Sequence, residues 1–416
     1  MPQAIQAYYG EFLINPVPLE MSLIEPCDYG CSYCFAVLGD RHQAAKSGKS
    51  VHANGTKAAM RLIADFQNRK TLEARLLQEG YPVLLSNRTD PLGRANRTAT
   101  LPMLEVMAEM EIPVAIQTKG FAKPDDLETV LEILQPSVWY ISIAFWDDDA
   151  RKRVEPGAPS IGDRLALIST LREAGHEVIV GFNPCVPEFL PDPEPLLKEL
   201  KARGVWGVWL ERLHLNHWQE KQLTDREKAS LGQDLITRAK KQATPAADFD
   251  HLMKARAIAQ DVGLEIYTMG QNNRSDFWQP YRRLYPKTFP TIQDYINACY
   301  DLEINDGDLL SFETLTAMCS DLLPSGVLQV GHYIGSTAHQ ICREMGSAWS
   351  NQMTYEQLLR MCWSDPRIKM GVANNLPFSY AYVTEDESEA LLVDEQDVPL
   401  MVWNSEGHEN LYVEVA

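Results

Sequence analysis

Three of the eight cysteines in this 416-residue sequence, Cys27, Cys31 and Cys34, fall within one short segment, Glu25 to Phe35. Thiolates are soft ligands that select iron–sulfur clusters, zinc or Cu(I), and three of them on one loop can hold three corners of one cluster. A four-iron cluster held in this way keeps one iron without a protein ligand, where a small chelating molecule could bind. Gly30 suits a backbone that wraps closely around such a core, because it has no Cβ.

Other uses of clustered cysteines fit the sequence less well. A structural zinc site takes four ligands, typically from two Cys-x-x-Cys knuckles, and the sequence has no second knuckle. A disulfide framework suits short secreted chains, whereas this chain is long and starts without a basic targeting region. The other five cysteines have no ligand-like spacing, and we expect most of them to be small buried hydrophobic residues. Zinc stays an alternative that metal analysis distinguishes.

The spacing Cys27-x3-Cys31-x2-Cys34, with the aromatic Tyr33 directly before the third cysteine, resembles the radical S-adenosylmethionine (SAM) superfamily. The resemblance implies a [4Fe–4S] cluster on the three cysteines, with its fourth iron chelated by the amino and carboxylate groups of SAM and with Tyr33 at the cofactor site. It also implies reductive cleavage of SAM to a 5′-deoxyadenosyl radical and an electron donor such as flavodoxin or ferredoxin. The protein would position cofactor against substrate and exclude water.

Composition and charge narrow the function classes. Hydrophobic residues make up 45% and charged residues 23% of the chain, which is ordinary for a globular protein. No run approaches the roughly 18 apolar residues of a membrane span, so we expect a cytoplasmic protein with reduced thiols and no membrane contact. The net charge is 38 minus 57, or −19, which disfavours tight non-specific binding to DNA or RNA unless basic residues cluster locally. The best local clusters are Arg151 to Arg153 and the mixed stretch Arg226 to Lys241.

Apolar runs alternate with helical patterns along most of the chain. The runs are continuous rather than alternating with polar residues, which favours a parallel sheet covered by helices. The predicted strands are Val17–Ile24, Pro82–Asn87, Pro113–Thr118, Val138–Phe145, Glu177–Phe182 and Val205–Leu213, with Leu264–Tyr267 as a candidate seventh. The predicted helices include Gly55–Leu77, Ala99–Met110, Pro124–Leu134, one from the N-cap Ser160 to Gly175, and Glu194–Ala202.

The fold class predicted from this order is α/β, a partial (β/α)6 barrel with an additional C-terminal α+β domain. We expect the core barrel domain to occupy residues 1–285 and a capping or substrate-binding domain to occupy residues 286–416. The second region looks helical to about Trp363. It then contains the strand-like runs Tyr380–Val383, Glu389–Val393 and Val398–Trp403.

Polar residues gather where the predicted strands end. In a parallel α/β barrel the working groups come from the loops at the carboxyl ends of the strands. SAM carries an ammonium, a carboxylate, two ribose hydroxyls and an adenine, and it needs a mixture of acceptors and cations around it. We therefore predict that Lys119, Ser142 and Asp90 contact a cofactor. The full set of candidate cofactor-binding residues is Tyr33, Ser86, Asp90, Lys119, Ser142, Glu155 and Arg164.

Several of these segments resemble the spore photoproduct lyase-like group within the same superfamily. The resemblance covers roughly residues 15–215. By resemblance, Lys119 and Ser142 would touch the methionyl carboxylate or the ribose of SAM, while Glu155 and Arg164 would form a charged pair beside it. Because an arginine fork matches a carboxylate, Arg164 could alternatively hold the SAM carboxylate. The matching segments are Ser86–Pro91, Thr118–Lys119, Val138–Ile143, Glu155–Ser160 with Arg164, and Asn183–Pro187.

One departure from the group concerns hydrogen donation. Spore photoproduct lyase has a cysteine donor where the second strand ends, but the corresponding segment here, Leu84–Thr89, contains no sulfur. Cys185, after the fifth strand, is the remaining cysteine placed to face the pocket and is our candidate catalytic residue. We expect SAM cleavage but little repair of spore photoproduct.

Three function hypotheses follow from these residues. The leading one is a radical SAM enzyme that abstracts hydrogen from an unactivated carbon of a nucleobase or nucleotide, a substrate class implied by the group resemblance only. The second is the same chemistry on a peptide or protein side chain. The third is an iron–sulfur redox sensor in a binding protein, which would have no need of polar strand ends converging on a SAM-sized pocket.

Overall fold

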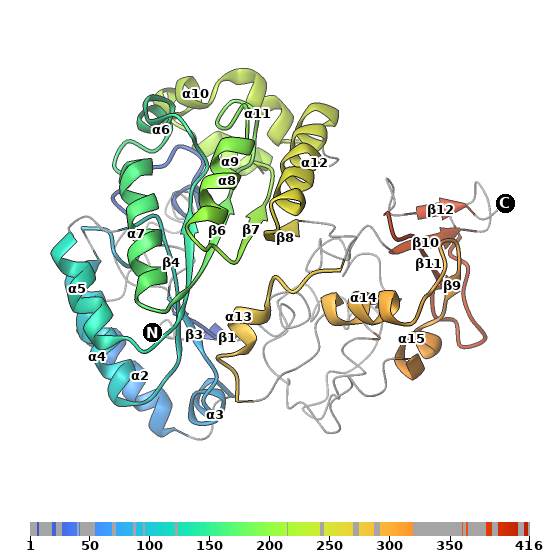
Figure 1. Ribbon diagram of the computed structural model, residues 1–416, viewed down its shortest axis with the longest axis horizontal. Helices are drawn as coiled ribbons and strands as arrows, with labels where there is room; N and C mark the ends of the chain where they lie inside the picture. The colour runs from blue at the N-terminus through green and yellow to red at the C-terminus, as the bar shows by residue number, and fades with distance from the viewer. Residues whose placement is uncertain are drawn as a thin grey trace. The chain divides into compact units, whose positions relative to one another are not determined.

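In a computed structural model of the chain, eight strands form one sheet in sequential order (Figure 1). The strands are β1 (Gln6–Ala7), β2 (Leu19–Met21), β3 (Val83–Leu85), β4 (Val114–Thr118), β5 (Val138–Ser142), β6 (Glu177–Phe182), β7 (Gly207–Leu210) and β8 (Glu265–Thr268). Strands β2 to β7 pair in parallel, each with the next. Since β1 and β8 are the two ends of the order, the described part of the sheet is a partial barrel.

Helices connect the strands and cover the outer face of the sheet (Figure 1). Helices α2, α4 and α5 pack side by side, α7 packs on β6, and α12 packs on β7. This is the arrangement expected when parallel strands are joined by crossover helices. The helices of this region are α2 (Gly55–Gln67), α3 (Leu72–Gln78), α4 (Arg97–Glu109), α5 (Pro124–Ile133), α6 (Asp148–Val154), α7 (Ile161–Glu173), α8 (Glu194–Ala202), α9 (His217–Gln222), α10 (Asp225–Leu231), α11 (Gln233–Ala239) and α12 (Ala246–Asp261).

Contacts divide the chain into two units, the first mainly Leu19–Tyr267 and the second mainly Thr268–Ala416. The second unit contains a separate sheet in the order β12-β10-β11-β9, in which β10 pairs antiparallel with β11 and parallel with β12. Its elements are α13 (Gln279–Arg282), α14 (Ile292–Asp301), β9 (Leu309–Leu310), α15 (Phe312–Met318), β10 (Tyr380–Thr384), β11 (Met401–Trp403) and β12 (Tyr412–Glu414). The predicted fold class is confirmed, while the capping role and the boundary at residue 285 stay predictions.

Some element predictions differ from the structure. The single helix predicted over Gly55–Leu77 is two helices, and the short helix α6 was not predicted. In the second unit, β9 lies in the stretch expected to be helical, where Leu310 pairs with Met401 of β11. Two-residue strands such as β9 form because the edge of a neighbouring strand offers hydrogen bonds, so the local sequence does not predict them.

The structure describes residues 6–7, 19–21, 27–39, 41, 55–68, 72–85, 89–94, 96–120, 124–213, 215–241, 245–268, 274–286, 292–318, 360, 363–364, 380–384, 390–406 and 412–414. Within these ranges, no helix has both the length and the apolar character required to cross a bilayer.

Candidate functional site

The cysteine loop lies against the segment that follows β5, and main-chain hydrogen bonds hold it there. Ser32 N donates to the carbonyl oxygen of Val154 at 2.8 Å, and Gly157 N donates to the carbonyl oxygen of Tyr29 at 2.8 Å. The Tyr29 hydroxyl also donates to the Gly120 carbonyl oxygen at 2.6 Å, directly after β4. Gly30 has φ +63°, a left-handed conformation that favours glycine. The loop is therefore shaped by its own turn and fastened to two neighbouring strand ends.

None of the three thiols of this loop is in a disulfide, and they gather in one cluster with Tyr29 and Ala158. Cys31 is buried, whereas Cys27 and Cys34 are partly exposed. Burial, reinforced by the negative charge of Asp90, raises the pKa of Cys27 to about 12. Thiols in such a setting stay protonated until a metal centre compensates the charge, so cluster binding releases protons.

The donor set fits a four-iron cluster better than a single ion. Among the described residues, no group of three or more His, Cys, Asp or Glu side chains could hold one metal ion. The thiol ligands of a four-iron cluster each bind a different iron, so they need not converge on one point. Three thiols on one turn, none of them in a disulfide, match that requirement.

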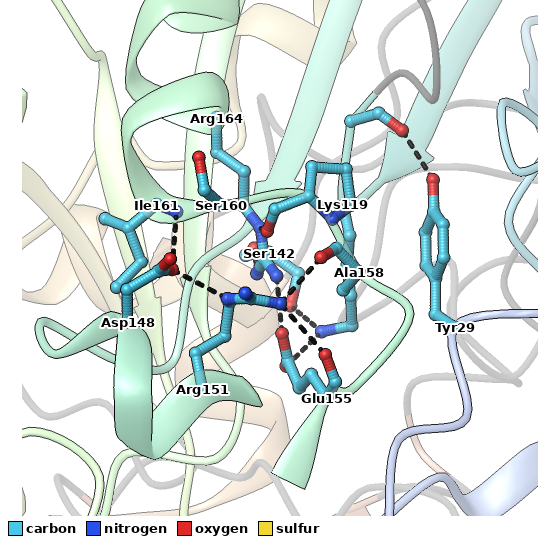
Figure 2. A network of polar contacts seen from close by, with 12 residues as sticks. Tyr29, Lys119, Ser142, Asp148, Arg151, Glu155, Ala158, Ser160, Ile161 and Arg164 are labelled. Atoms are coloured by element: carbon cyan, nitrogen blue, oxygen red, sulfur yellow. Dashed lines mark hydrogen bonds and ion pairs between the residues drawn. The ribbon is translucent and has the colours of Figure 1, made fainter. Parts of the chain in front are cut away.

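Beside the cysteine loop, the Lys119 ammonium lies at the carboxyl end of β4 and meets three oxygen atoms. Figure 2 shows its side chain converging with that of Arg164 on Glu155. Lys119 Nζ donates to Tyr33 OH at 3.0 Å, Ser142 Oγ at 2.8 Å and Glu155 Oε1 at 2.8 Å. An ammonium has three donors, and this geometry uses them all. Two of the three acceptors are neutral hydroxyls, which a negatively charged ligand could replace.

Glu155 and Arg164 form a fully buried ion pair behind Lys119. Arg164 Nη2 lies 2.5 Å from Glu155 Oε2, and neither side chain is exposed to solvent. The other guanidinium nitrogens donate to the carbonyl oxygens of Ser142 at 2.8 Å and Pro159 at 3.1 Å. Burial alone would raise the pKa of Glu155, but the Arg164 guanidinium and the Lys119 ammonium outweigh it and lower that pKa to about 2. Arg164 thus holds Glu155 and the strand end, which favours the charged pair over direct contact with a ligand carboxylate.

Tyr33 joins the cysteine loop to this network. Its hydroxyl donates to Glu155 Oε1 and accepts from Lys119 Nζ, while the ammonium also lies 5.4 Å from the centre of its ring. The residue before the third cysteine therefore touches both the Lys119 ammonium and the Glu155 carboxylate.

We expect Tyr33→Phe to lower the free energy of unfolding by about 1.5–3 kcal/mol, because the hydroxyl is buried and both of its partners are charged. Tyr29→Phe is the matched control on the same loop, since the Tyr29 hydroxyl donates to a neutral carbonyl. The control should lose about 0.5–1.5 kcal/mol. Urea unfolding measures both, and a smaller loss for Tyr33→Phe than for Tyr29→Phe would contradict the role given to Tyr33.

Asp90 braces the ends of β3 and β4. Its carboxylate accepts from the main-chain N–H of Lys119 at 2.7 Å, the Thr118 hydroxyl at 2.8 Å and the main-chain N–H of Leu92 at 3.0 Å. Burial raises the pKa of Asp90 to about 6, although these three donors favour its charged form. The side chain predicted to contact a cofactor thus positions the Lys119 backbone, and its cofactor contact stays a prediction.

Sequence reasoning treated Arg151 as part of a basic surface cluster, and the structure places it inside. Only 4% of the residue is exposed. Its guanidinium donates to the carbonyl oxygens of Glu155 at 3.0 Å and Ala158 at 2.6 Å, and to Asp148 Oδ1 at 2.7 Å (Figure 2). Arg151 therefore shapes the loop that carries Glu155. The N-cap Asp147 at the start of α6 was the available sequence signal.

The predicted N-cap Ser160 is present and starts α7 with a full capping box. Its hydroxyl accepts from Asp163 N, and the Asp163 carboxylate accepts from Ser160 N. The following residue, Arg164, is thereby held in the first turn of the helix, where it faces Glu155.

Two predicted site residues are not brought into this network. Ser86 lies outside the described residues. Cys185 is fully buried, and its main-chain N–H donates to the Glu211 carbonyl oxygen at 2.6 Å. Burial raises the pKa of its thiol to about 12. Its role as a hydrogen donor stays a prediction.

Comparison with family models gives no match. Uncharacterized proteins of Mycobacterium bovis and Mycobacterium tuberculosis are 30% identical to the chain over 199 residues, which is 45% of this chain and 56% of each relative. An uncharacterized protein of Acidianus two-tailed virus is 28% identical over 142 residues, covering 33% of this chain and 47% of the relative. The chain thus spans about half the length of these curated relatives.

Solved structures with similar folds include those of spore photoproduct lyase and of SuiB. Spore photoproduct lyase complexed with dinucleoside spore photoproduct is 14% identical with a TM-score of 0.44, covering 61% of this chain and 76% of that one. A mutant of that lyase with bound AdoMet and the same dinucleoside has a TM-score of 0.45. Streptococcus suis SuiB bound to S-adenosylmethionine is 14% identical with a TM-score of 0.36, covering 62% of this chain and 47% of that one. The chain is structurally similar to spore photoproduct lyase and to SuiB.

Proposed function

We propose that this chain is a radical SAM enzyme. The observation that carries the proposal is the contact between its two chemical parts: three thiols outside any disulfide on one loop, and a lysine ammonium within hydrogen-bond distance of Tyr33 on that same loop. Such an arrangement suits a metal cluster and an anionic group bound side by side. A redox sensor would need the thiols but not the ammonium.

Cys27, Cys31 and Cys34 would hold a [4Fe–4S] cluster. When bound and reduced by an electron donor such as flavodoxin or ferredoxin, the cluster would supply the electron that cleaves SAM into methionine and a 5′-deoxyadenosyl radical. None of the five cysteines that the structure describes is in a disulfide, in keeping with the reducing, cytoplasmic setting that such a cluster requires.

The chain's own residues would bind and orient the cofactor. Lys119 offers a buried positive charge to the methionyl carboxylate, and Ser142 beside it offers a hydroxyl. Glu155 keeps the ammonium in place, and its single negative charge is shared between Lys119 and Arg164. The low exposure of Lys119, 15% of its side chain, limits the water around that charge and strengthens its interaction with an anion.

For the substrate, we propose a nucleobase or nucleotide, with a peptide or protein side chain as the second candidate. The hydrogen abstraction would take place at the carboxyl ends of the strands, where Cys185 is the candidate donor of a returning hydrogen atom. The second unit, beginning near residue 268, is the candidate for substrate binding.

Lys119→Ala tests the proposal. We expect the anaerobically reconstituted variant to keep its cluster but to bind SAM about 10- to 100-fold more weakly, because a hydrogen bond to a charged group contributes roughly 1.5–3 kcal/mol. Equilibrium dialysis measures the affinity, and 5′-deoxyadenosine formed with dithionite reports cleavage.

Lys198→Ala is the control, because Lys198 is an exposed lysine paired with Glu194 on α8. It should leave SAM affinity unchanged. Equal affinities in the wild type and in Lys119→Ala would show that the cofactor binds elsewhere, and absence of SAM binding by the reconstituted wild type would refute the proposed function.

A further inference from the structure

The inner face of the sheet becomes polar at the carboxyl ends of β6 and β7. Alternate residues of a strand point to opposite faces. The face that packs against the helices carries apolar side chains: Trp139, Ile141, Val178, Val180, Phe182, Val208 and Leu210. The opposite face carries Tyr140 and Ser142 on β5, Gly181 on β6 and Trp209 on β7, since Ser142 pairs with Gly181 and Gly181 pairs with Trp209.

Aromatic contacts confirm that these residues share one face. The Trp209 ring lies edge-on to Tyr140, with centres 5.9 Å apart, and edge-on to Tyr267 of β8, with centres 4.8 Å apart. Tyr140 reaches across β6 only because position 181 is glycine: a Cβ there would lie 1.6 Å from the Tyr140 hydroxyl oxygen. Tyr140, Trp209 and Tyr267 thus form an aromatic layer on this face of the sheet, and it packs directly on Gly181.

Glu211 and Asn183 stand at the edge of this layer. Glu211 lies two positions after Trp209, so both side chains face inward, and Asn183 follows β6 in the same register. Asn183 Nδ2 donates to Glu211 Oε2 at 3.1 Å, and the Trp209 side chain is also hydrogen-bonded to that carboxyl group. The following residue, Arg212, turns instead to the Lys241 carbonyl oxygen. We call these two side chains the Glu211–Asn183 pair.

The pair lies on the same side of the sheet as the Lys119 network. Ser142, which accepts from Lys119, is on β5, and Glu211 follows β7, two strands away. Neighbouring strands are about 4.8 Å apart, which separates the two groups by about 10 Å. A cofactor held at Lys119 would therefore have the Glu211–Asn183 pair across the barrel mouth, where a substrate must lie.

The chemistry of the pair selects one kind of group. A carboxylate is an acceptor with about four lone-pair sites, and a carboxamide offers both a second N–H and a carbonyl oxygen. Together they match a neutral edge that presents an N–H beside a C=O, as an amide, lactam or imide does. A phosphate or carboxylate at this position would be repelled by Glu211.

We propose that the Glu211–Asn183 pair binds the substrate through a neutral amide-type edge, with Glu211 accepting its N–H and Asn183 donating to its C=O. This rests on the proposed function for the position of the cofactor, and it adds the substrate chemistry. A nucleobase imide and a peptide amide are two sources of this edge.

Matched probes separate the two sources. Binding of thymidine and of N3-methylthymidine, which lacks the imide N–H, is measured by calorimetry on the reconstituted, SAM-loaded protein. N-acetylglycine N-methylamide and its fully N-methylated analogue are the peptide pair. We expect one parent probe to bind at least about tenfold more tightly than its methylated partner, because a hydrogen bond to a charged group is lost.

Variants then locate that preference. Glu211→Ala should abolish the preference for the N–H form, and Asn183→Ala should weaken both members of a probe pair alike, whereas Glu188→Gln, which removes an exposed carboxylate paired with Arg238, should change neither. A preference that survives in Glu211→Ala overturns the inference, and so does failure of all four probes to bind the wild type. SAM affinity measured in the same samples keeps the two proposals apart: SAM bound without a Glu211-dependent preference overturns only this inference, and SAM unbound by the wild type overturns the proposed function.

Discussion

Replacing any one of Cys27, Cys31 or Cys34 by alanine should leave the anaerobically reconstituted protein without a stable cluster. Each thiol is expected to bind a different iron, so the loss of one thiol leaves that iron without its protein ligand. The wild type should carry about four irons per chain. Iron and acid-labile sulfide analysis, together with visible absorbance, measures the loss.

Two other cysteines provide the control for this prediction. Cys185 and Cys299 lie outside the Cys27–Cys34 segment of the sequence and are fully buried, so Cys185→Ala and Cys299→Ala should retain the iron of the wild type. One equivalent of zinc in the wild type, without iron-dependent absorbance, would contradict the cluster. Equal iron in a loop variant and the wild type would show that the cysteine in question is not a ligand.

Glu155→Gln should destabilise the protein by about 3–5 kcal/mol, the usual cost of leaving a buried charge without its partner. The carboxylate faces both Arg164 and Lys119, and neither the Glu155 nor the Arg164 side chain is exposed. The matched control is Glu199→Gln, which breaks a pair with Arg203 on the surface of α8, where the Glu199 side chain is 38% exposed. That pair should contribute only about 0.3–0.5 kcal/mol. The losses in the free energy of unfolding of the two variants, measured by urea unfolding, should therefore differ several-fold.

The same pair predicts a pH dependence. The pKa of Glu155 is lowered from its ordinary 4.5 to about 2 in the folded protein. Because the folded state holds the proton less readily, the stabilisation is complete above about pH 4.5 and is lost as pH falls toward 2. Glu155→Gln should lack this part of the acid sensitivity. If Glu155→Gln lowered the free energy of unfolding at neutral pH by under about 1 kcal/mol and left the acid sensitivity unchanged, the pair would not stabilise the fold.

Patterns within single segments predicted most of the barrel. Continuous apolar runs predicted all six parallel strands. Five of them match to within a few residues, and the sixth, β6, spans Glu177–Phe182 as predicted. Glu194–Ala202 is α8, and the Ser160 cap starts α7. These elements form because of local apolar patterns and capping residues, and both can be recognised in a single sequence. The break between α2 and α3 was missed because their apolar spacing continues across it.

The site itself was predicted in part. The residue types at the strand ends pointed to Lys119, Ser142, Glu155 and Arg164, which the structure brings together. What each does depends on distant partners: Asp90 turned out to brace the Lys119 backbone, and Arg151 turned inward to hold the loop of Glu155. The Glu211–Asn183 pair was missed because its members are 28 residues apart and meet only when β6 and β7 are in register.

Gly157 shows how the cysteine loop is held without any metal. A Cβ at this position would lie 2.5 Å from the Asp28 carbonyl oxygen and 2.9 Å from the Tyr29 Cα, so two main chains touch there directly. The conformational entropy of ordering the loop is consequently lost when the barrel folds. In a zinc finger, by contrast, metal binding and folding are a single event. Under the proposed function, cluster assembly and folding would then be separate equilibria for this chain, and a cluster destroyed by oxygen could be rebuilt without unfolding the protein.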